Sequence, residues 1–168
     1  STGVVSVSWG DASNNEDGFR VERSQFVGGV WTNATLIITA ANVTSLVDTP
    51  AQGVYRYRVQ AFNVAGDSAF TSYSDLMPRP ASGASATRVN RVVTLRWSDN
   101  SAFESGFQYE HQRLQGATWV THAIVQLAPN AVSYARSCQP GQNRFRVAAK
   151  GPNGVLTAFT PYIQVTVP

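Results

Sequence analysis

The stretch GVYRYRVQAFNVAG, residues 53–66, alternates apolar and polar side chains over most of its length. Tyr55, Tyr57 and Val59 fall on one face of an extended chain, and Arg56 and Arg58 fall on the other. A period of two is typical of a half-buried β-strand, and glycines at both ends are typical of turns. The stretch therefore predicts a strand over 54–62 with one face in an apolar core.

The same pattern returns 88 residues further along the chain, where residues 143–150 read NRFRVAAK. A shift of 88 also relates Trp9 to Trp97 and Trp31 to Trp119, and it leaves 21 of 80 aligned positions identical without a gap. Repeats of this length correspond to an autonomous small domain rather than to a solenoid unit. The sequence therefore predicts two copies of one domain, 1–78 and 79–168.

Runs of alternating residues separated by Gly, Asn, Asp and Pro predict strands throughout both copies, with no helical stripe. In the first copy strands are expected at 4–9, 18–25, 30–38, 43–47, 54–62 and 68–76. In the second copy they are expected at 83–88, 91–97, 106–113, 118–126, 131–136, 143–150 and 155–167. Strands at this spacing without helices favour an all-β fold of two β-sandwiches, joined by a short link in which Pro78 and Pro80 restrict motion.

Residues 53–66 resemble strand F and the following loop of fibronectin type III domains, and the tryptophan that closes the second apolar strand resembles their core tryptophan. Residues 9–19 resemble the loop between strands B and C of bacterial members. The resemblance implies two tandem immunoglobulin-like sandwiches of about seven strands each. It also implies that Trp9 and Trp97 are sealed between facing sheets.

Two departures from this family pattern affect the first strand and one corner. Residues 81–88 supply a strand A in the second copy, whereas the first copy begins at strand B. Either the start has been trimmed or another subunit supplies that strand by β-augmentation. The tyrosine corner of the family would fall on Tyr55, but its counterpart is Asn143, so this corner is lost or rebuilt in the second copy.

Composition limits the class of protein. Hydrophobic residues make up 43% of the chain and charged residues 14%, which is enough for a packed core. The sequence has no run of 18 apolar residues, so it predicts no membrane span. The single cysteine, Cys138, excludes an internal disulfide and is interpreted as a tolerated small residue in a turn. The first copy carries 4 basic and 7 acidic groups, a net −3, and the second carries 9 and 3, a net +6.

Six residues are candidates for facing a ligand. Trp31 and Trp119 recur at matched positions, which is compatible with a sugar platform or with packing. Phe70 and Tyr73, like Phe26 and Phe103, are interpreted as exposed loop aromatics that the two copies do not share. Arg144 and Arg146, like the arginines of the first copy, are expected on the outer face, in exposed pairs with the glutamates of the neighbouring strand. The candidate residues are Trp31, Trp119, Phe70, Tyr73, Arg144 and Arg146.

The remaining polar motifs favour structural roles. Glu16 and Glu104, in matched loops, are expected to accept backbone N–H bonds and to hold their turns, not to bind metal or catalyse. His111, expected to be half-buried near Cys138, lacks the orienting group and oxyanion site of a nucleophilic centre. The sequence therefore predicts no enzyme activity, no metal site and no cofactor.

The resemblance implies a non-catalytic spacer and interaction module of a larger secreted or cell-surface protein, for example one accessory to a polysaccharide-active enzyme. Its expected partners are the flanking domains of that protein, a polysaccharide or another subunit. One alternative is a structural subunit of an extracellular filament or adhesin that is completed by strand donation. Another is a weak carbohydrate- or polyanion-binding module; the basic second copy motivates it, but no nucleic-acid motif is present.

Overall fold

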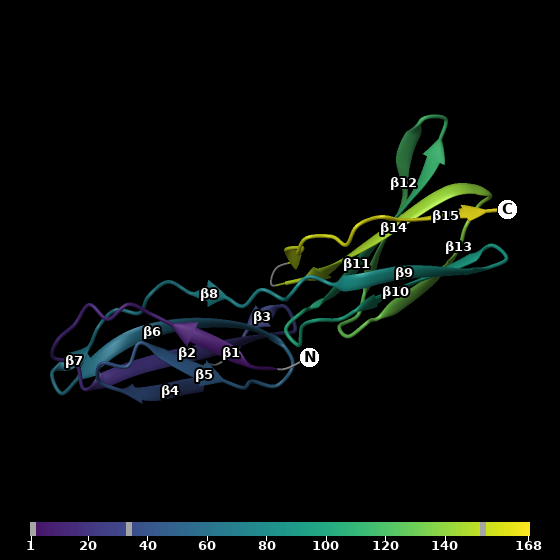
Figure 1. Cartoon of the computed structure of the whole chain (residues 1–168). Coiled ribbons are helices and arrows are strands. Elements are labelled where there is room, and N and C mark those ends of the chain that lie inside the picture. Colours follow the sequence, from purple (N-terminus) through teal and green to yellow (C-terminus); the bar gives the residue numbers. More distant parts are fainter. Residues whose placement is uncertain (1–2, 33–34, 152–153) are drawn as a thin grey trace. The chain divides into compact units, whose positions relative to one another are not determined.

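The computed structural model describes residues 3–32, 35–151 and 154–168. The chain divides into two compact units, Thr2–Leu76 and Met77–Pro168, which we call the first and the second domain. Each is built from antiparallel strands, labelled in Figure 1. The chain is thus all-β, as the sequence predicted.

The first domain consists of a two-stranded sheet and a larger sheet. The small sheet pairs β1 with β5. In the larger sheet β2 and β6 lie side by side, β3 and β4 both pair with β2, and β7 and β8 both pair with β6. The strands are β1 (Val5–Ser8), β2 (Gly18–Val27), β3 (Val30–Trp31), β4 (Thr35–Ala40), β5 (Ser45–Asp48), β6 (Val54–Asn63), β7 (Gly66–Asp67) and β8 (Ser74–Asp75).

The second domain repeats this plan, and its smaller sheet has one additional strand. Its smaller sheet has the order β13-β10-β9 and its larger sheet the order β12-β11-β14-β15. The strands are β9 (Ser82–Val89), β10 (Val92–Ser98), β11 (Gly106–Gln115), β12 (Thr118–Leu127), β13 (Ser133–Ser137), β14 (Gly141–Lys150) and β15 (Ile163–Val167). Because β10 is the 88-residue counterpart of β1, β9 is the strand for which the described part of the first domain has no equivalent.

Alternation positions the side chains as predicted. Tyr55, Tyr57 and Val59 of β6 are buried, whereas Arg56 and Arg58 are half-buried on the other face. In β14 Phe145 and Val147 are fully buried. Apolar burial of this kind stabilises by about 25 cal/mol per Å² removed from water. Each domain therefore has its own core, and the outer face of its larger sheet is left to polar and aromatic side chains.

The last predicted strand of each copy is shorter than expected. In the interval 68–76 the structure has a strand only at Ser74–Asp75, and in 155–167 only at Ile163–Val167. Side-chain hydroxyls explain the difference, because they take the place of backbone carbonyls. The Ala61 and Val59 amides of β6 donate to the hydroxyls of Ser68 and Thr71 over 2.9 and 3.0 Å. The segment beside β6 is therefore hydrogen-bonded to β6 without forming a regular strand.

The two core tryptophans differ in burial. Trp97 is 5% exposed, as predicted. Trp9 is only half-buried, so the prediction that it is sealed between the sheets is wrong. Both rings pack on a phenylalanine, Phe19 or Phe107, with centroids 5.6 and 5.7 Å apart. Trp9 follows β1, beside which no described residues form a counterpart of β9, and this position explains its greater exposure.

No helix in the described part of the chain is long and apolar enough to cross a membrane.

Candidate functional site

The outer face of the larger sheet in the first domain carries a stack of alternating arginine and aromatic side chains. Arg56 lies over the rings of Trp31 and Tyr73, with its guanidinium carbon 4.3 and 3.6 Å from their centroids. Arg58 lies over Tyr73 and Phe70 at 4.5 and 4.1 Å. We call this row, Trp31–Arg56–Tyr73–Arg58–Phe70, the first ladder. Each distance is within the range of a cation–π contact, which contributes roughly 0.5–1 kcal/mol at exposed sites.

The second domain carries an equivalent row. Arg144 lies over Trp119 and Tyr162 at 4.4 and 4.0 Å. Arg146 lies over Tyr162 and Phe159 at 4.5 and 4.1 Å. This row, Trp119–Arg144–Tyr162–Arg146–Phe159, is the second ladder. The two domains therefore repeat one arrangement of five side chains with closely similar spacing.

The backbone explains how the rungs alternate. The arginines are two residues apart on β6 and on β14, so they point to the same side of the sheet. The phenylalanine and the tyrosine of each ladder come from the segment beside these strands and are three residues apart, as Phe70 and Tyr73 are, whereas the tryptophans lie on β3 and β12. Thr71, between them, donates its amide to the Val59 carbonyl and accepts the Val59 amide with its hydroxyl. These two hydrogen bonds to one residue hold the segment so that Phe70 and Tyr73 reach between the arginines.

In each ladder one buried glutamate accepts hydrogen bonds from an arginine and from the tyrosine. Arg58 donates to both carboxylate oxygens of Glu22 over 2.9 and 2.7 Å, and the Tyr73 hydroxyl donates to the same carboxylate. Burial alone would raise the pKa of Glu22, but the hydrogen bonds from Arg58 and Tyr73 outweigh it and the pKa is lowered. The bond to Glu22 in turn raises the pKa of Arg58. The predicted cross-strand pair is present, but its glutamate is 8% exposed, so the prediction of an exposed pair is wrong.

Glu110 occupies the same place in the second ladder. Arg146 donates to its Oε2 over 2.8 and 2.6 Å, and the Tyr162 hydroxyl donates to Oε1 over 3.1 Å. Burial first, and then the bond to Glu110, raise the pKa of Tyr162. Glu110 is 5% exposed, so this pair is also less exposed than predicted. In both ladders a carboxylate neutralises one of two stacked cations.

The structure brings all six candidate residues into the two ladders. Trp31, Phe70 and Tyr73 belong to the first and Trp119, Arg144 and Arg146 to the second, and each is half-buried. That they contact a ligand stays a prediction. Sequence reasoning missed Phe159 and Tyr162, which contact the same arginines and belong to the second ladder.

The interpretation of Phe70 and Tyr73 as unshared aromatics is wrong. The segments SAFTSY, residues 68–73, and TAFTPY, residues 157–162, match at a shift of 89 rather than 88. The second segment is preceded by one additional residue, so a comparison at the fixed shift of 88 does not align the two segments. The two other aromatics of that group, Phe26 and Phe103, are half-buried and buried, so they are not exposed either. Allowing one gap would have revealed the signal.

The loop carboxylates hold turns, as predicted. Asn42 and Asn130, which both take a positive φ of about 60°, donate their amides to Glu16 and Glu104 over 3.1 Å. The Ser13 hydroxyl also donates to Glu16 over 2.7 Å, and this bond is the main reason that the pKa of Glu16 is lowered. The pKa of Glu104 is instead raised, first by burial, and its Oε2 has no hydrogen-bond partner among the described residues.

His111 and Cys138 both lie deeper than the sequence suggested. His111 is 1% exposed, and its Nε2 is 2.8 Å from the Asn143 side-chain oxygen. Burial is the main reason that the pKa of His111 is lowered and that the pKa of Cys138 is raised. Cys138 lies in the connection between β13 and β14, as interpreted from the sequence, and its side chain belongs to the core with Trp97. Within the described ranges no three His, Cys, Asp or Glu side chains form a group that could hold a metal ion.

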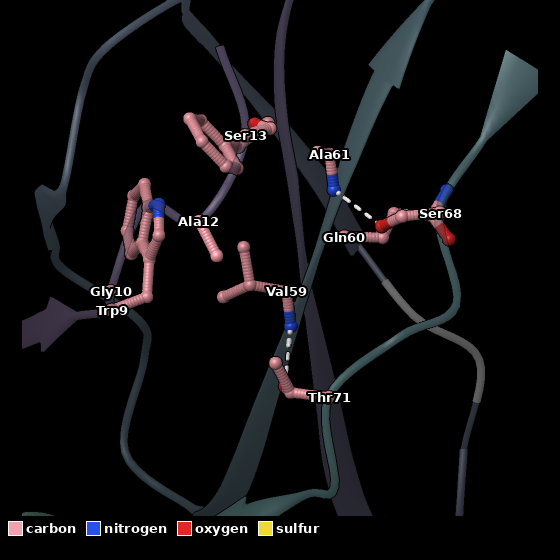
Figure 2. Close-up of a pocket in the computed structure, with 10 residues that line it drawn as sticks. Trp9, Gly10, Ala12, Ser13, Val59, Gln60, Ala61, Ser68 and Thr71 are labelled. Carbon is pink, nitrogen blue, oxygen red and sulfur yellow. Dashed lines mark hydrogen bonds between the residues drawn. The ribbon is translucent and has the colours of Figure 1, made fainter. Parts of the chain in front are cut away.

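An apolar cleft of about 270 Å³ opens beside Trp9 in the first domain. Figure 2 shows Trp9 and Ala12 on one side and Val59, Ser68 and Thr71 on the other. The Trp9 indole N–H has no hydrogen-bond partner in the part of the chain that the structure describes. The cleft holds no titratable side chain, so its lining favours an apolar occupant rather than chemistry.

Searches of family models and of curated proteins found no match to the sequence. Solved structures do match. A two-domain fibronectin type III segment of chicken tenascin is 12% identical with a TM-score of 0.59, covering 99% of this chain and 92% of that one. The FN1–FN3 domains of chicken CNTN1 match at 16% identity and a TM-score of 0.43, over 98% of this chain and 62% of that one.

The chicken interferon gamma receptor alpha chain matches at 11% identity and a TM-score of 0.47, over 97% of this chain and 91% of that one. At such identities the likeness concerns the fold alone, and only the tenascin segment is similar enough to carry an argument. The likeness to that segment and the sheet orders of the two domains indicate the same fold. The chain therefore has the fold of two fibronectin type III domains in tandem.

Proposed function

We propose that the chain is a non-catalytic spacer and interaction module of a larger extracellular protein. The main observation in support of this proposal is the pair of ladders. Each domain uses its row of arginine and aromatic side chains to tie three neighbouring segments of its own larger sheet together. Each tyrosine ring has two guanidinium groups over it, which leaves little free aromatic face for a sugar. We therefore assign the ladders to domain stability, which suits a part that holds others in place.

The remaining reactive groups support the same assignment. The loop glutamates accept backbone amides, and Asn143 and the ring of Phe145 hold His111 in place. Burial raises the pKa of the Cys138 thiol, which keeps it protonated and unreactive. Such a thiol is compatible with an oxidising compartment, and the extracellular location otherwise depends on the fibronectin type III resemblance.

The spacer role is tested by measuring the distance between the domains. Single dyes are attached through Val64→Cys and Val132→Cys in a Cys138→Ser background, since both valines are exposed. We expect single-molecule energy transfer to give one narrow distribution, because the link contains Pro78 and Pro80. Replacing both prolines by glycine should broaden it. A distribution that is already broad with the prolines in place would contradict the spacer role.

The non-catalytic interaction role is tested against carbohydrate binding. Affinity electrophoresis in gels containing neutral or acidic polysaccharides, and a heparin column at physiological salt, should show no retardation of the chain. Retardation that Trp119→Ala removes, in a variant that remains folded by circular dichroism, would instead assign the second ladder to ligand binding. Trp31→Ala is the matched variant for the first ladder.

A further inference from the structure

One corner of the second domain gathers basic side chains where the first domain has an ion pair. In the first domain Arg23 donates to Asp48, with a nitrogen–oxygen distance of 2.8 Å. The shift of 88 residues relates Arg23 to His111 and Asp48 to Arg136. The second domain therefore has a cation at the position where the first domain has its carboxylate.

The strand registers place Arg136 at the position of Asp48. Asp48 on β5 is opposite Val5 of β1, and Arg136 on β13 is opposite Val93 of β10. Val5 and Val93 are both buried in their cores. Because directly opposite residues of an antiparallel pair share one face, the side chain of Arg136 starts on the inner face of its sheet, as that of Asp48 does.

Arg113 reaches the same corner from the larger sheet. It follows His111 by two residues on β11, so the two side chains share a face. Its guanidinium donates to the Pro140 carbonyl over 2.8 Å, in the connection between β13 and β14. Burial first, and then the charges of His122, Arg136 and Arg113, lower the pKa of His111, so both arginines lie near this ring. We call Arg113 and Arg136 the corner arginines.

The described part of the chain does not neutralise the corner arginines. The second domain has three acidic side chains. Glu110 bonds an arginine of the outer face, and Asp99 and Glu104 lie in the loop between β10 and β11. The Nε groups of both corner arginines are buried and have no hydrogen-bond partner among the described residues. A buried donor without an acceptor costs roughly 1–3 kcal/mol, so an anion from outside the domain would be stabilised here.

The corner is accessible from solvent. Both corner arginines are half-buried, and His122, whose ring lies 5.2 Å from that of His111, is exposed. A further cation, Arg88, is exposed on β9 and lies opposite Val93, in one row with Arg136. Cations from both sheets therefore surround a place that an external ligand can reach, and their summed field attracts a negative group.

We propose that the corner arginines bind an aspartate or glutamate side chain from an acidic segment of another polypeptide. The first domain indicates the ligand class, because its matching corner holds a carboxylate: Asp48 accepts two hydrogen bonds from Arg23 and one from the Tyr57 hydroxyl. A planar guanidinium also matches a carboxylate with two parallel hydrogen bonds. The partner thus supplies the carboxylate that the second domain lacks at Arg136.

The test uses the complete chain and a fluorescent peptide in which glutamate alternates with serine. We expect saturable binding by fluorescence polarisation that weakens as salt is added, and a change in the imidazole NMR signals of His111. Arg136→Gln and Arg113→Gln should each weaken binding by about tenfold, as for the loss of a hydrogen bond to a charged group. Arg96→Gln removes the same charge from an exposed position on β10 and should weaken binding by no more than about twofold.

A double variant, His111→Arg with Arg136→Asp, gives the corner the residues of the first domain. It should form an internal ion pair and abolish peptide binding. Its net charge changes by the same amount as in Arg96→Gln, so a general effect of charge is controlled. Circular dichroism and thermal unfolding show whether the variant is folded, and the single substitutions decide the outcome if it is not.

Three results would overturn the proposal. One is the absence of peptide binding at low salt. Another is equal weakening by Arg136→Gln, Arg113→Gln and Arg96→Gln, which would indicate general attraction to a basic domain. The third is a heparin oligosaccharide that binds through Arg136 while the peptide does not, which would assign the corner to a sulfated polysaccharide. The spacer role is tested separately by the distance between the domains and does not depend on this corner.

Discussion

The two domains are nearly identical on one sheet and different on the other. On the larger sheet the ladders repeat with the same order of rungs, and in each a glutamate bonds one arginine and the tyrosine. On the smaller sheet the first domain has two described strands and the second has three. The outer face of the larger sheet is therefore the stabilising feature that the domains share. The features that distinguish the domains lie at the edge of the smaller sheet and in the corner next to it.

That corner is held by an ion pair in the first domain and by a buried histidine and asparagine in the second. In the first, Arg23 donates to both oxygens of Asp48 over 2.9 and 2.8 Å, and the Tyr57 hydroxyl donates to Asp48 over 3.0 Å. The counterparts of Arg23 and Tyr57 are His111 and Phe145, whose rings stack 4.7 Å apart.

Asn143, fully buried beside this pair, donates to the carbonyls of Gln139 and Gly141 over 3.3 and 2.9 Å. The corner of the second domain is therefore rebuilt around an amide, one of the two outcomes that the sequence left open. The change from an ion pair to a buried histidine predicts that the two domains respond differently to pH.

The largest effect is expected from the middle rung of each ladder. Tyr73→Ala and Tyr162→Ala each remove a ring that two guanidinium groups cover and a hydroxyl bonded to the buried glutamate. We expect each to destabilise its own domain by roughly 2–3 kcal/mol, somewhat less than the cost of truncating a fully buried aromatic. Hydrogen exchange under increasing urea would follow the two domains separately. Effects that differ by more than twofold would break the equivalence of the ladders.

Acid is expected to destabilise the second domain before the first. Burial lowers the pKa of His111, with His122, Arg136 and Arg113 adding to the effect. The unfolded chain therefore binds a proton that the folded domain excludes. Stability is complete above the ordinary pKa of histidine and falls as the pH drops below it. Because both histidines lie in the second domain, the first domain has no such contribution.

Amide exchange at pH 7 and pH 5 would measure this difference. His111→Gln keeps an amide that can bond Asn143 but cannot titrate, so it should flatten the pH dependence of the second domain. His122→Gln, at an exposed position, removes only the smaller contribution of the neighbouring ring, so it should leave most of the pH dependence in place. A pH dependence that survives His111→Gln would show that another group causes it.

A smaller difference lies within the ladders themselves. Arg144 donates from Nε to the Gln112 side chain over 2.8 Å, whereas the Nε of Arg56 has no hydrogen-bond partner among the described residues. The counterpart of Gln112 is Ser24, which is too short to take its place. Gln112→Ser should therefore destabilise the second domain by about 1 kcal/mol, as for the loss of one hydrogen bond. Urea denaturation followed by exchange at β14 would show it, and an unchanged midpoint would mean that water replaces the glutamine.

The sequence predicted the parts of this structure that depend on local alternation. The strands from β1 to β6 and from β9 to β14 follow from period-two patterns and turn residues, and the pairing of Arg58 with Glu22 follows from register. The ladders could not be predicted as ladders, because Phe70 and Tyr73 lie three residues apart in a segment that the sequence predicted as a regular strand, on which they would point to opposite faces. The exposure of Trp9 depends on a neighbouring strand, which is a tertiary property that the residues around Trp9 do not encode.

The smallest effect is expected from the loop glutamates Glu16 and Glu104, whose pKa values are shifted in opposite directions. Glu16 and Glu104 are counterparts that bond the same asparagine amide, yet the Ser13 hydroxyl bonds only Glu16 and burial dominates at Glu104. The lowered pKa of Glu16 means that its charge stabilises the first domain above the ordinary pKa of a glutamate, and that this stability is lost as the pH falls through the lowered value. The raised pKa of Glu104 has the opposite consequence, because the folded state binds the proton more tightly and stability falls as the pH rises through the raised value.

At pH 7, therefore, Glu16→Gln should lower the unfolding midpoint of the first domain, since the amide cannot accept the Ser13 and Asn42 bonds with a full charge. Glu104→Gln should leave the second domain unchanged or raise its midpoint, since the amide relieves a buried charge beside Asp99 and can donate to it. Exchange-monitored thermal unfolding of the two variants gives both signs in one experiment. If both substitutions destabilise equally, the two loops hold their carboxylates in the same environment, and the contrast between the domains is confined to the edge and the corner.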